Sequence, residues 1–584
     1  DDSTQSLKSA IVSSCILVEA RNHQQQTSNN VDHPKKMVRI HGGQSSPVLS
    51  LSTDESNADK DDTKRTPKLT HGIWIWMEGG DNSSRIKNNN KFDISISNFV
   101  IHQSTGSGIK IALIDNNNNS NDDTNSDVDI LNNNNNDMEI RLYNVTSTHN
   151  GGDGLEVVGD DAVTFQLLIQ GGIYNNNSGN GLNIAAVTTT NTASVSSSIP
   201  SSSSVVVLNT AVNKNRRNGI RIQTRTTSTT SSNTISATME DSTPFQLAID
   251  SVAIHDNQWF GIVVTDKNND DDVGENNRKT KDNKESTDSV VSDISNYNVN
   301  FMVTNSLVFQ NGHDGLLVVT EGTNTTIEQS SFLQNGYYDD DDDDEIDVRR
   351  RRTRISSSSS SKTSTPYGSG ISIYDPYAVS ILRTEVIDNR QNGIQIIDIK
   401  PRQQLEESST QSSSPPTATS TSVAILVDLH SFHNVRDGLL IVGENTDNMD
   451  ESDPLSSPTV IFDNVRTCSN GRNGMTFFFV PSPIEIVATT TATSTPIPSL
   501  VSCHNIDGWD YQFAGITDDH FEGSDTTVPL IVGTSCTNAI GEGTGGIDLC
   551  DTTSSDSTST TTEIDITTGL VFDLQHCDDH VNSC

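Results

Sequence analysis

Aromatic side chains are scarce in this 584-residue sequence, at 5%, and hydrophobic residues of all kinds make up only 32%. Basic residues are also few, because 37 Lys and Arg stand against 77 Asp and Glu, which gives a net charge of -40. Low hydrophobicity with a high net charge is typical of disordered chains. The acidic balance argues against general nucleic-acid binding, which needs cationic side chains to displace counterions from phosphates. It is compatible with a neutral or cationic partner, calcium included.

Long apolar runs are missing as well. No run approaches the ~20 residues of a membrane-spanning helix, so no membrane span is predicted. Six of the seven cysteines fall after residue 467, and none forms a Cys-x-x-Cys pair, which argues against zinc and favours disulfides. Disulfides indicate an oxidising compartment, and we therefore expect an extracellular or cell-surface protein. Acceptor triplets for N-glycosylation agree with this location and begin at Asn82, Asn118, Asn144, Asn176 and Asn324.

The apolar residues that are present lie in short runs, separated by tracts of Asn, Ser, Thr and Asp. One phrase recurs: Asn, three variable residues, Gly, then apolar-x-apolar, as in Asn215-Arg-Arg-Asn-Gly219-Ile-Arg-Ile. The phrases that end at Gly108 and Gly370 are expected to lack the asparagine. In the other phrases it is Asn150, Asn177, Asn215, Asn257, Asn311, Asn389, Asn434 and Asn470. Such self-similarity is the signature of a repeat architecture.

A second apolar run precedes each phrase, so each unit is predicted to form three short strands joined by turns. The spacing from Gly370 to Gly393 gives one uninterrupted unit of 23 residues. Longer spacings contain low-complexity insertions, which are expected to be mobile. Six of them leave just after the strand that follows Gly, at 114–137, 186–204, 224–243, 266–293, 398–420 and 443–457, whereas 337–367 enters at the Asn turn. A common insertion point is what a solenoid predicts.

Stacking of about ten such units would give a narrow core, and the repeated asparagines are predicted to form a ladder that satisfies backbone groups in the turns. The phrase resembles the repeat of right-handed parallel β-helix proteins of the pectin-lyase-like fold. The resemblance implies an all-β solenoid over 94–480, with entry coils in 1–93 and a cysteine-containing cap in 481–584. That family includes polysaccharide lyases, hydrolases, epimerases and adhesins, so the resemblance does not specify an activity.

Side chains alternate in direction along a strand, so the second residue after each Gly should point outward. Lys110, Glu156, Asn183 and Arg221 are the polar members of this row and the candidate substrate-binding residues. The row then becomes apolar at Val263 and Leu317, and the outer face towards the C-terminus is expected to be covered. Asp153 and its equivalents, one residue before Gly, are expected to be turn residues.

No catalytic set is recognised. Tyr374-Asp375-Pro376-Tyr377 resembles the Asp-Pro-His-Asp signature of alginate epimerases on this fold, but Tyr377 and Ala378 replace its His and Asp. The sequence therefore favours a β-helix that binds a polysaccharide or cell-surface glycan, or that has a structural or adhesive role. The alternative is a polysaccharide lyase or epimerase. No cofactor is predicted. The cluster Arg349–Arg354 is interpreted as part of a charged loop, or alternatively as a site of trypsin-like processing.

Overall fold

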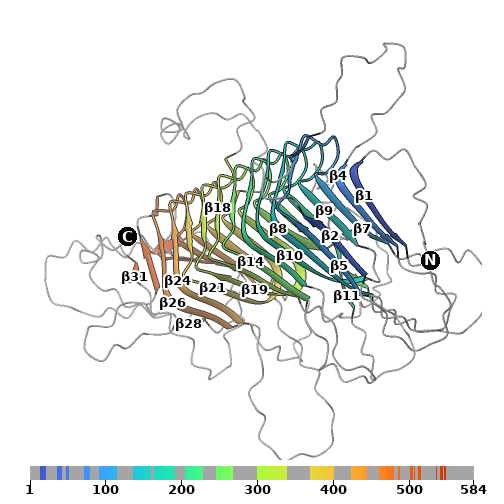
Figure 1. Cartoon of the computed structure of the whole chain (residues 1–584). Coiled ribbons are helices and arrows are strands. Elements are labelled where there is room, and N and C mark those ends of the chain that lie inside the picture. Colours follow the sequence, from blue (N-terminus) through green and yellow to red (C-terminus); the bar gives the residue numbers. More distant parts are fainter. Residues whose placement is uncertain are drawn as a thin grey trace, which may run out of the picture.

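The computed structural model describes residues 14–21, 36–41, 48–50, 71–78, 91–114, 136–159, 163–190, 204–227, 245–266, 299–337, 368–399, 423–443, 459–478, 484–486, 500–503, 505–506, 511–514, 534–535, 540–542 and 545–547. These residues form 33 strands and no helix. Nearly all neighbouring strands pair in parallel, and they follow one another in chain order along a single stack (Figure 1). The prediction of an all-β parallel β-helix is confirmed.

Each coil contributes to three faces. Face A contains the strand that follows the repeat glycine. Its strands are β1 (Ser14–Arg21), β4 (His71–Glu78), β7 (Ile109–Ile114), β9 (Leu155–Gly159), β11 (Leu182–Thr190), β13 (Ile220–Thr227), β16 (Ile262–Asp266), the first parts of β19 (Leu316–Glu328) and β21 (Ile371–Leu382), β23 (Ile394–Ile397), β25 (Leu439–Val442), β27 (Met475–Phe478), β30 (Tyr511–Ala514) and β32 (Ile540–Glu542). The short β33 (Gly545–Ile547) pairs with β32 in the antiparallel direction.

Face B follows face A in each coil. It consists of β2 (Lys36–His41), β5 (Lys91–Ser97), the first parts of β8 (Asn136–Thr148), β10 (Val163–Asn175) and β12 (Ser204–Asn213), then β14 (Phe245–Asp250), β17 (Val299–Thr304), the last parts of β19 and β21, the first parts of β24 (Val423–Phe432) and β26 (Thr459–Cys468), and β28 (Ile484–Ile486).

Face C completes the coil before the asparagine turn. It consists of β3 (Val48–Ser50), β6 (Val100–His102), the last parts of β8, β10, β12, β24 and β26, and the short strands β15 (Ala253–His255), β18 (Leu307–Phe309), β20 (Ser331–Leu333), β22 (Glu385–Ile387), β29 (Leu500–Cys503) and β31 (Thr534–Ser535). The parallel pairing of β2 with β5 and of β26 with β28 and β29 continues the stack across residues 94 and 480.

The core is a column of aliphatic side chains, because the residue after each repeat glycine points inward in every coil. Ile109, Leu155, Leu182, Ile220 and Ile262 stack in register on face A and have no exposed surface. Burial of one such side chain contributes about 1.5–3 kcal/mol. A chain with few apolar residues can therefore fold, since its buried apolar residues are concentrated in one narrow column.

The repeat glycine is required by close stacking. A Cβ atom at Gly219 would lie 2.6 Å from the carbonyl oxygen of Gly261 and 2.8 Å from Nδ2 of Asn257. Positive φ occurs elsewhere, at two residues per coil. One lies between faces B and C, at Asn98, Asn144, Gly171, Asn209, Ser251, Asn305, Gln329, Arg383, Asp428 and Asn464; the other immediately precedes the ladder position, as at Gln103, His149, Asn176 and Lys214. These single left-handed residues turn the chain between faces.

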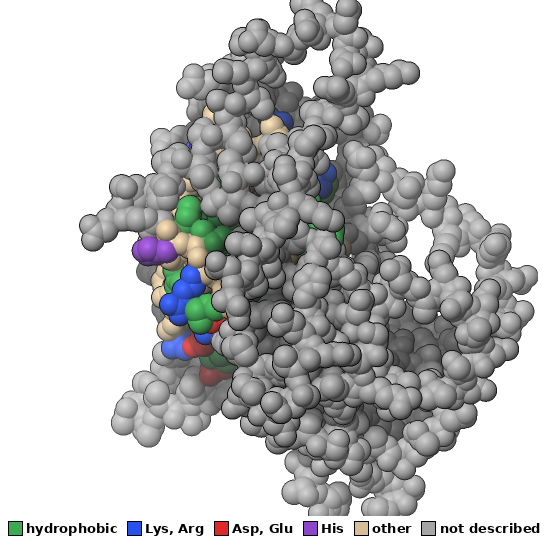
Figure 2. Space-filling model, turned by 45° about the vertical axis from the view of Figure 1, so that its right-hand side comes forward, with side chains coloured by type: hydrophobic (Ala, Val, Ile, Leu, Met, Phe, Trp, Pro, Cys, Tyr) green, Lys and Arg blue, Asp and Glu red, His purple; other side chains and the backbone are tan. Residues whose placement is uncertain are grey.

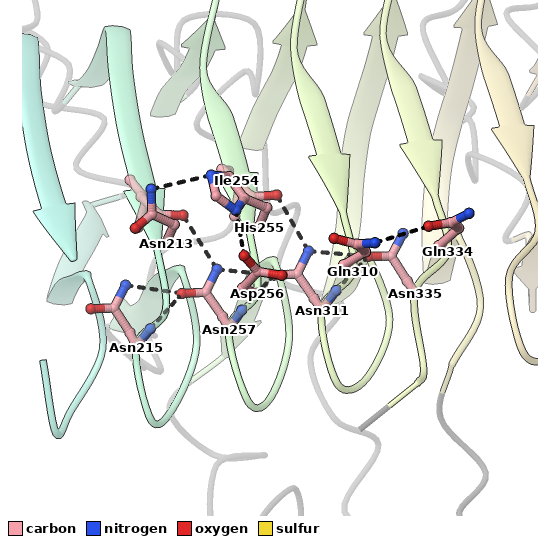
Figure 3. A network of polar contacts seen from close by, with 11 residues as sticks. Asn213, Asn215, Ile254, His255, Asp256, Asn257, Gln310, Asn311, Gln334 and Asn335 are labelled. Atoms are coloured by element: carbon pink, nitrogen blue, oxygen red, sulfur yellow. Dashed lines mark hydrogen bonds and ion pairs between the residues drawn. The ribbon is translucent and has the colours of Figure 1, made fainter. Parts of the chain in front are cut away.

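The asparagine at the turn into face A makes the same two contacts in successive coils (Figure 3). In the central coils, Oδ1 of Asn257 accepts hydrogen bonds from Nδ2 of Asn215 at 2.9 Å and from its backbone N–H at 3.1 Å. Oδ1 of Asn311 does the same for Asn257. These side chains are at most 1% exposed. Hydrogen bonds of this ladder run through Asn150, Asn177, Asn215, Asn257, Asn311, Asn389, Asn434 and Asn470.

Two features of the ladder differ from the sequence prediction. The coil of Gly370 does have an asparagine, Asn335, which forms hydrogen bonds with both Asn311 and Asn389. The insertion at 337–367 separates Asn335 from Gly370 in the sequence. Asn505 extends the ladder beyond Asn470. In the coil of Gly108, Ser104 takes the position, and its Oγ donates to Oδ1 of Asn150 at 2.7 Å. Because of the insertion at 337–367, the repeat spacing did not reveal Asn335 as a ladder residue.

The insertions themselves, including Arg349–Arg354, lie almost entirely outside the described residues. Most of the cysteine-rich 481–584 segment does too. The predictions about loop mobility, processing and a C-terminal cap therefore stay predictions.

Candidate functional site

The outward row of face A brings the candidate binding residues together. Strand pairing places Lys110 opposite Glu156, Glu156 opposite Asn183, and Asn183 opposite Arg221. Adjacent strands lie about 4.8 Å apart. The four side chains thus form a line across four consecutive coils, β7, β9, β11 and β13.

An ion pair fixes the first two members of this row. Nζ of Lys110 lies 2.6 Å from Oε1 of Glu156, and Oγ of Ser107 donates to Oε2 at 2.7 Å. The lysine and glutamate side chains are 25% and 18% exposed, so both are accessible but restricted. An ion pair this accessible contributes at most about 1 kcal/mol to stability. Its main consequence is that one cation and one carboxylate are held in fixed positions on the outer surface.

Asn183 is held from below by Asp153, which lies one residue before Gly154. Oδ2 of Asp153 accepts from Nδ2 of Asn183 at 2.8 Å, and Oδ1 accepts from the backbone N–H of Asn180 at 2.5 Å. Burial raises the pKa of Asp153, and repulsion from Glu156 adds to the rise, whereas the Asn180 and Asn183 donors oppose it. Asp153 therefore supports the row from within the turn.

This support continues as a second, shorter ladder. Oδ1 of Asn180 accepts from the backbone N–H of Asn218 at 3.1 Å and from its Nδ2 at 3.0 Å. Oδ1 of Asn218 then accepts from the backbone N–H of Phe260 at 3.2 Å. The residues before each repeat glycine thus have a structural role in these turns.

Two tryptophans extend the row towards the N-terminus. Trp74 on β4 lies opposite Lys110, and Trp76 lies opposite Ala112. The two indole rings are 5.8 Å apart between centroids, and His71 contacts Trp74 edge-on at 5.5 Å. This segment was expected among the entry coils and not in the site. The signal was available, since Gly72-Ile-Trp-Ile has the apolar-x-apolar pattern of a repeat strand without its preceding asparagine.

His71 adds a titratable group at the same end of the row. Its Nδ1 accepts from the backbone N–H of Ser107 at 3.0 Å. Burial lowers the pKa of His71, and the charge of Lys110 lowers it further, while Glu156 opposes the shift. The imidazole is therefore neutral near pH 7. Figure 2, which brings the N-terminal end of the stack forward, shows basic, acidic, histidine and hydrophobic side chains mixed on the described surface.

The polar row ends at Arg221, which is partly buried and faces Val263 on the next strand. Val263 and Leu317 are outward by position, yet only 3% and 2% exposed, and they pack with Phe260. Trp259, Val319 and Tyr374 pack around this cluster. The expected apolar continuation is thus buried in the structure and offers no open binding surface.

Further along, the outward row becomes an internal amide network. Nε2 of Gln395 donates to Oγ of Ser372 at 2.8 Å and to the hydroxyl of Tyr374 at 2.9 Å. Tyr374 begins the Tyr-Asp-Pro-Tyr segment, in which Asp375 has a positive φ of 52° and therefore turns the chain. Neither His nor a second Asp accompanies it. The described part of this segment contains no acid–base pair of the epimerase type.

Among the described residues, no group of three or more His, Cys, Asp or Glu side chains is arranged to hold a metal ion. Within the same residues there is also no helix long and apolar enough to cross a membrane.

Comparison with known proteins gives distant structural similarities. No family model and no curated protein matches the sequence. Similar solved structures include the periplasmic alginate epimerase AlgG, with 9% identity and a TM-score of 0.30 over 76% of this chain and 77% of that one. Pectate lyase Pel9A matches with 10% identity and a TM-score of 0.26 over 78% of each chain. The A-module of the Azotobacter vinelandii mannuronan C-5 epimerase AlgE4 has 10% identity and a TM-score of 0.21, with coverages of 76% and 87%.

The chain is a parallel β-helix protein. Its strand pairing establishes this independently of any relative, and similarities at this level carry no information about its chemistry. What the site can bind or catalyse has to be inferred from the side chains on face A. They provide two aromatic rings, a cation paired with a carboxylate, an anchored amide and an arginine, all in one line.

Proposed function

We propose that the protein is a polysaccharide-binding β-helix that acts outside the cell, and that the row Trp74, Lys110, Glu156, Asn183 and Arg221 is its binding surface. The observation that carries the proposal is the register of this row, because five side chains of complementary chemistry occupy one position on five successive strands. An extended polymer of sugar units presents hydroxyl and ring surfaces along a line. A β-helix presents its contacts along a line as well.

Four members of the row have a suitable contact to offer, and Asn183 lies between them. Trp74 and Trp76 provide aromatic ring surface, which suits the apolar side of a sugar ring. Lys110 and Arg221 donate hydrogen bonds, and Glu156 accepts them. The ion pair already holds Lys110 and Glu156, and Asp153 holds Asn183. Little entropy of these side chains would therefore be lost on binding.

An extracellular location is supported by cysteine chemistry. Cys468, at the end of β26, is disulfide-bonded, and the strand register places it opposite Cys503 on β29. Disulfides persist in oxidising compartments.

A catalytic function is the second candidate, and one observation favours it. His71, Lys110 and Glu156 interact electrostatically with one another at the tryptophan end of the row, and Asp153 lies beneath Asn183. A neutral imidazole beside a carboxylate can move a proton, which a lyase or epimerase requires. The Lys110–Glu156 ion pair occupies the most accessible base and acid of this group, and we therefore favour binding.

A glycan-array screen followed by mutation tests the proposal. The double variant Lys110→Ala/Arg221→Ala should lose at least tenfold in affinity for any glycan that the parent binds. The control Lys214→Ala/Arg216→Ala removes the same charge from exposed turn residues and should keep the affinity. Equal affinity in both double variants would rule out the row as the binding surface. Unsaturated or epimerised products formed by the parent, and lost in His71→Gln, would favour the catalytic alternative.

A further inference from the structure

A groove lies at the corner between faces B and C, whereas the repeat glycines lie at the turn into face A. It has a volume of about 640 Å³ and crosses strands β8, β10, β12 and β15. Its lining includes Asn144, Thr146, Gly171, Gly172, Ala211 and Ala253. The polar row on face A does not contribute to it.

One coil lacks side chains at this corner of the groove. Gly171 occupies the left-handed turn position that Asn144 and Asn209 occupy in the coils on either side. A Cβ atom at Gly171 would lie 2.6 Å from Oδ1 of Asn144. Gly172, the next residue, pairs with Val145 and Thr210. Two consecutive glycines therefore allow the side chain of Asn144 to lie close against this coil, at the edge of the groove.

Asn144 also begins an acceptor triplet, Asn144-Val145-Thr146, and both of its polar residues line the groove. We propose that Asn144 carries an N-linked glycan and that the first sugar lies in this groove. In the transfer, Nδ2 of Asn144 forms a bond to the anomeric carbon of a lipid-pyrophosphate-linked oligosaccharide. The lipid pyrophosphate is the leaving group, and the amide loses one proton.

The folded state can accommodate this bond at Asn144. The side chain is exposed, and its Nδ2 donates a long hydrogen bond of 3.3 Å to Oδ1 of Asn98. A glycosylated amide keeps one N–H, so that contact can persist. Ala211, Ala253 and the 42%-exposed Ile173 provide apolar surface beside the attachment point, on which one side of a sugar ring can pack.

The other described triplets lack this combination. Asn324 is partly buried on face B, and its Nδ2 donates to Oδ1 of Asn300 at 3.0 Å. Asn176 is partly buried and directly precedes Asn177 of the buried ladder. Asn82 and Asn118 lie outside the described residues.

The test is expression of the full chain through the secretory pathway of a eukaryotic cell, with site occupancy measured by mass spectrometry. Asn144 should be glycosylated in most molecules. Asn144→Gln should abolish that modification and still fold, because Gln329 occupies the same left-handed turn position in another coil. Secreted, folded protein in which Asn144 is mostly unmodified would overturn the proposal.

A second measurement tests the place of the first sugar. In a variant whose other triplets are removed (Asn82→Gln, Asn118→Gln, Asn176→Gln and Asn324→Gln), trimming the glycan to its first sugar should preserve the thermal midpoint. Complete enzymatic removal should then lower the midpoint by a few degrees. Equal midpoints for the trimmed and the sugar-free protein would show that the groove does not hold the sugar. Because secretion is imposed in this experiment, its outcome is independent of polysaccharide binding on face A.

Discussion

The two halves of the outward row on face A differ in chemistry although they occupy equivalent positions. From Trp74 to Arg221 the row is aromatic and polar, whereas Val263 and Leu317 in the next two coils are buried and apolar. The inward columns do not change between the halves, since Ile220, Ile262 and Leu316 are all fully buried. The comparison shows that the inward residues keep their apolar character from coil to coil, while the outward residues vary.

The largest effect on stability is expected when a charge is placed in the apolar half of the row. Leu317→Lys should lower the free energy of unfolding by about 3–5 kcal/mol, because the ammonium group would be buried without a partner. Arg221→Leu, two coils earlier, should change it by no more than about 1 kcal/mol. Urea unfolding of both variants measures the difference. A stable Leu317→Lys protein would show that the apolar half is open to solvent in solution.

The ladder should matter equally in both halves. Asn389→Ala removes the acceptor for Asn335 and the donor to Asn434, so the free energy of unfolding should fall by about 1–3 kcal/mol. Asn300→Ala, on the partly exposed outer side of face B, is the control and should cost about 0.5 kcal/mol or less. If both variants were equally stable, the asparagine ladder would not be a stabilising element.

Asp314 gives the apolar half a pH dependence. Burial raises the pKa of Asp314 to about 6, although the backbone N–H groups of Gly368 and Ser369 and the hydroxyl of Ser372 favour its ionised form. A carboxyl whose folded pKa is raised stabilises the fold fully below its unfolded pKa of about 4, and this contribution is lost as the pH rises through 6. Between pH 5 and 7.5, wild type should therefore lose about 1–2 kcal/mol relative to Asp314→Asn.

The neighbouring histidine supplies an internal control of opposite sign. Burial lowers the pKa of His313 to about 4, so its contribution is present above pH 6.5 and is lost as the pH falls. His313→Gln should therefore gain stability relative to wild type at pH 5. Unfolding curves of the three proteins at both pH values separate the two groups, and a pH-independent difference between Asp314→Asn and wild type would contradict the assignment.

The smallest effect on stability is expected in the polar half. Lys110→Ala should change the free energy of unfolding by no more than about 1 kcal/mol, since the ion pair with Glu156 is partly exposed. The variant should lose glycan affinity while its thermal midpoint stays nearly unchanged. A parallel loss of stability and affinity would indicate that the residue acts only by supporting the fold.

The sequence was sufficient to predict the coil because the repeat glycine and the inward aliphatic residues are required in nearly every turn. It was insufficient where the same geometry tolerates other residues. Ser104 replaces an asparagine at the ladder, and Arg383 and His149 adopt left-handed turns without being typical of them. Asn335 was missed because an insertion separates it from its glycine. The outward row was readable residue by residue, but the partners that fix it, Ser107 and Asp153, depend on how the turns stack.

The most direct test of polysaccharide binding on the polar half uses its own tryptophans. The chain has four, and Trp259→Phe/Trp509→Phe leaves only Trp74 and Trp76. Titration of this variant with a glycan that it binds calorimetrically should change the tryptophan fluorescence with the same dissociation constant. Saturable calorimetric binding without any change in fluorescence would contradict a binding surface at Trp74 and Lys110.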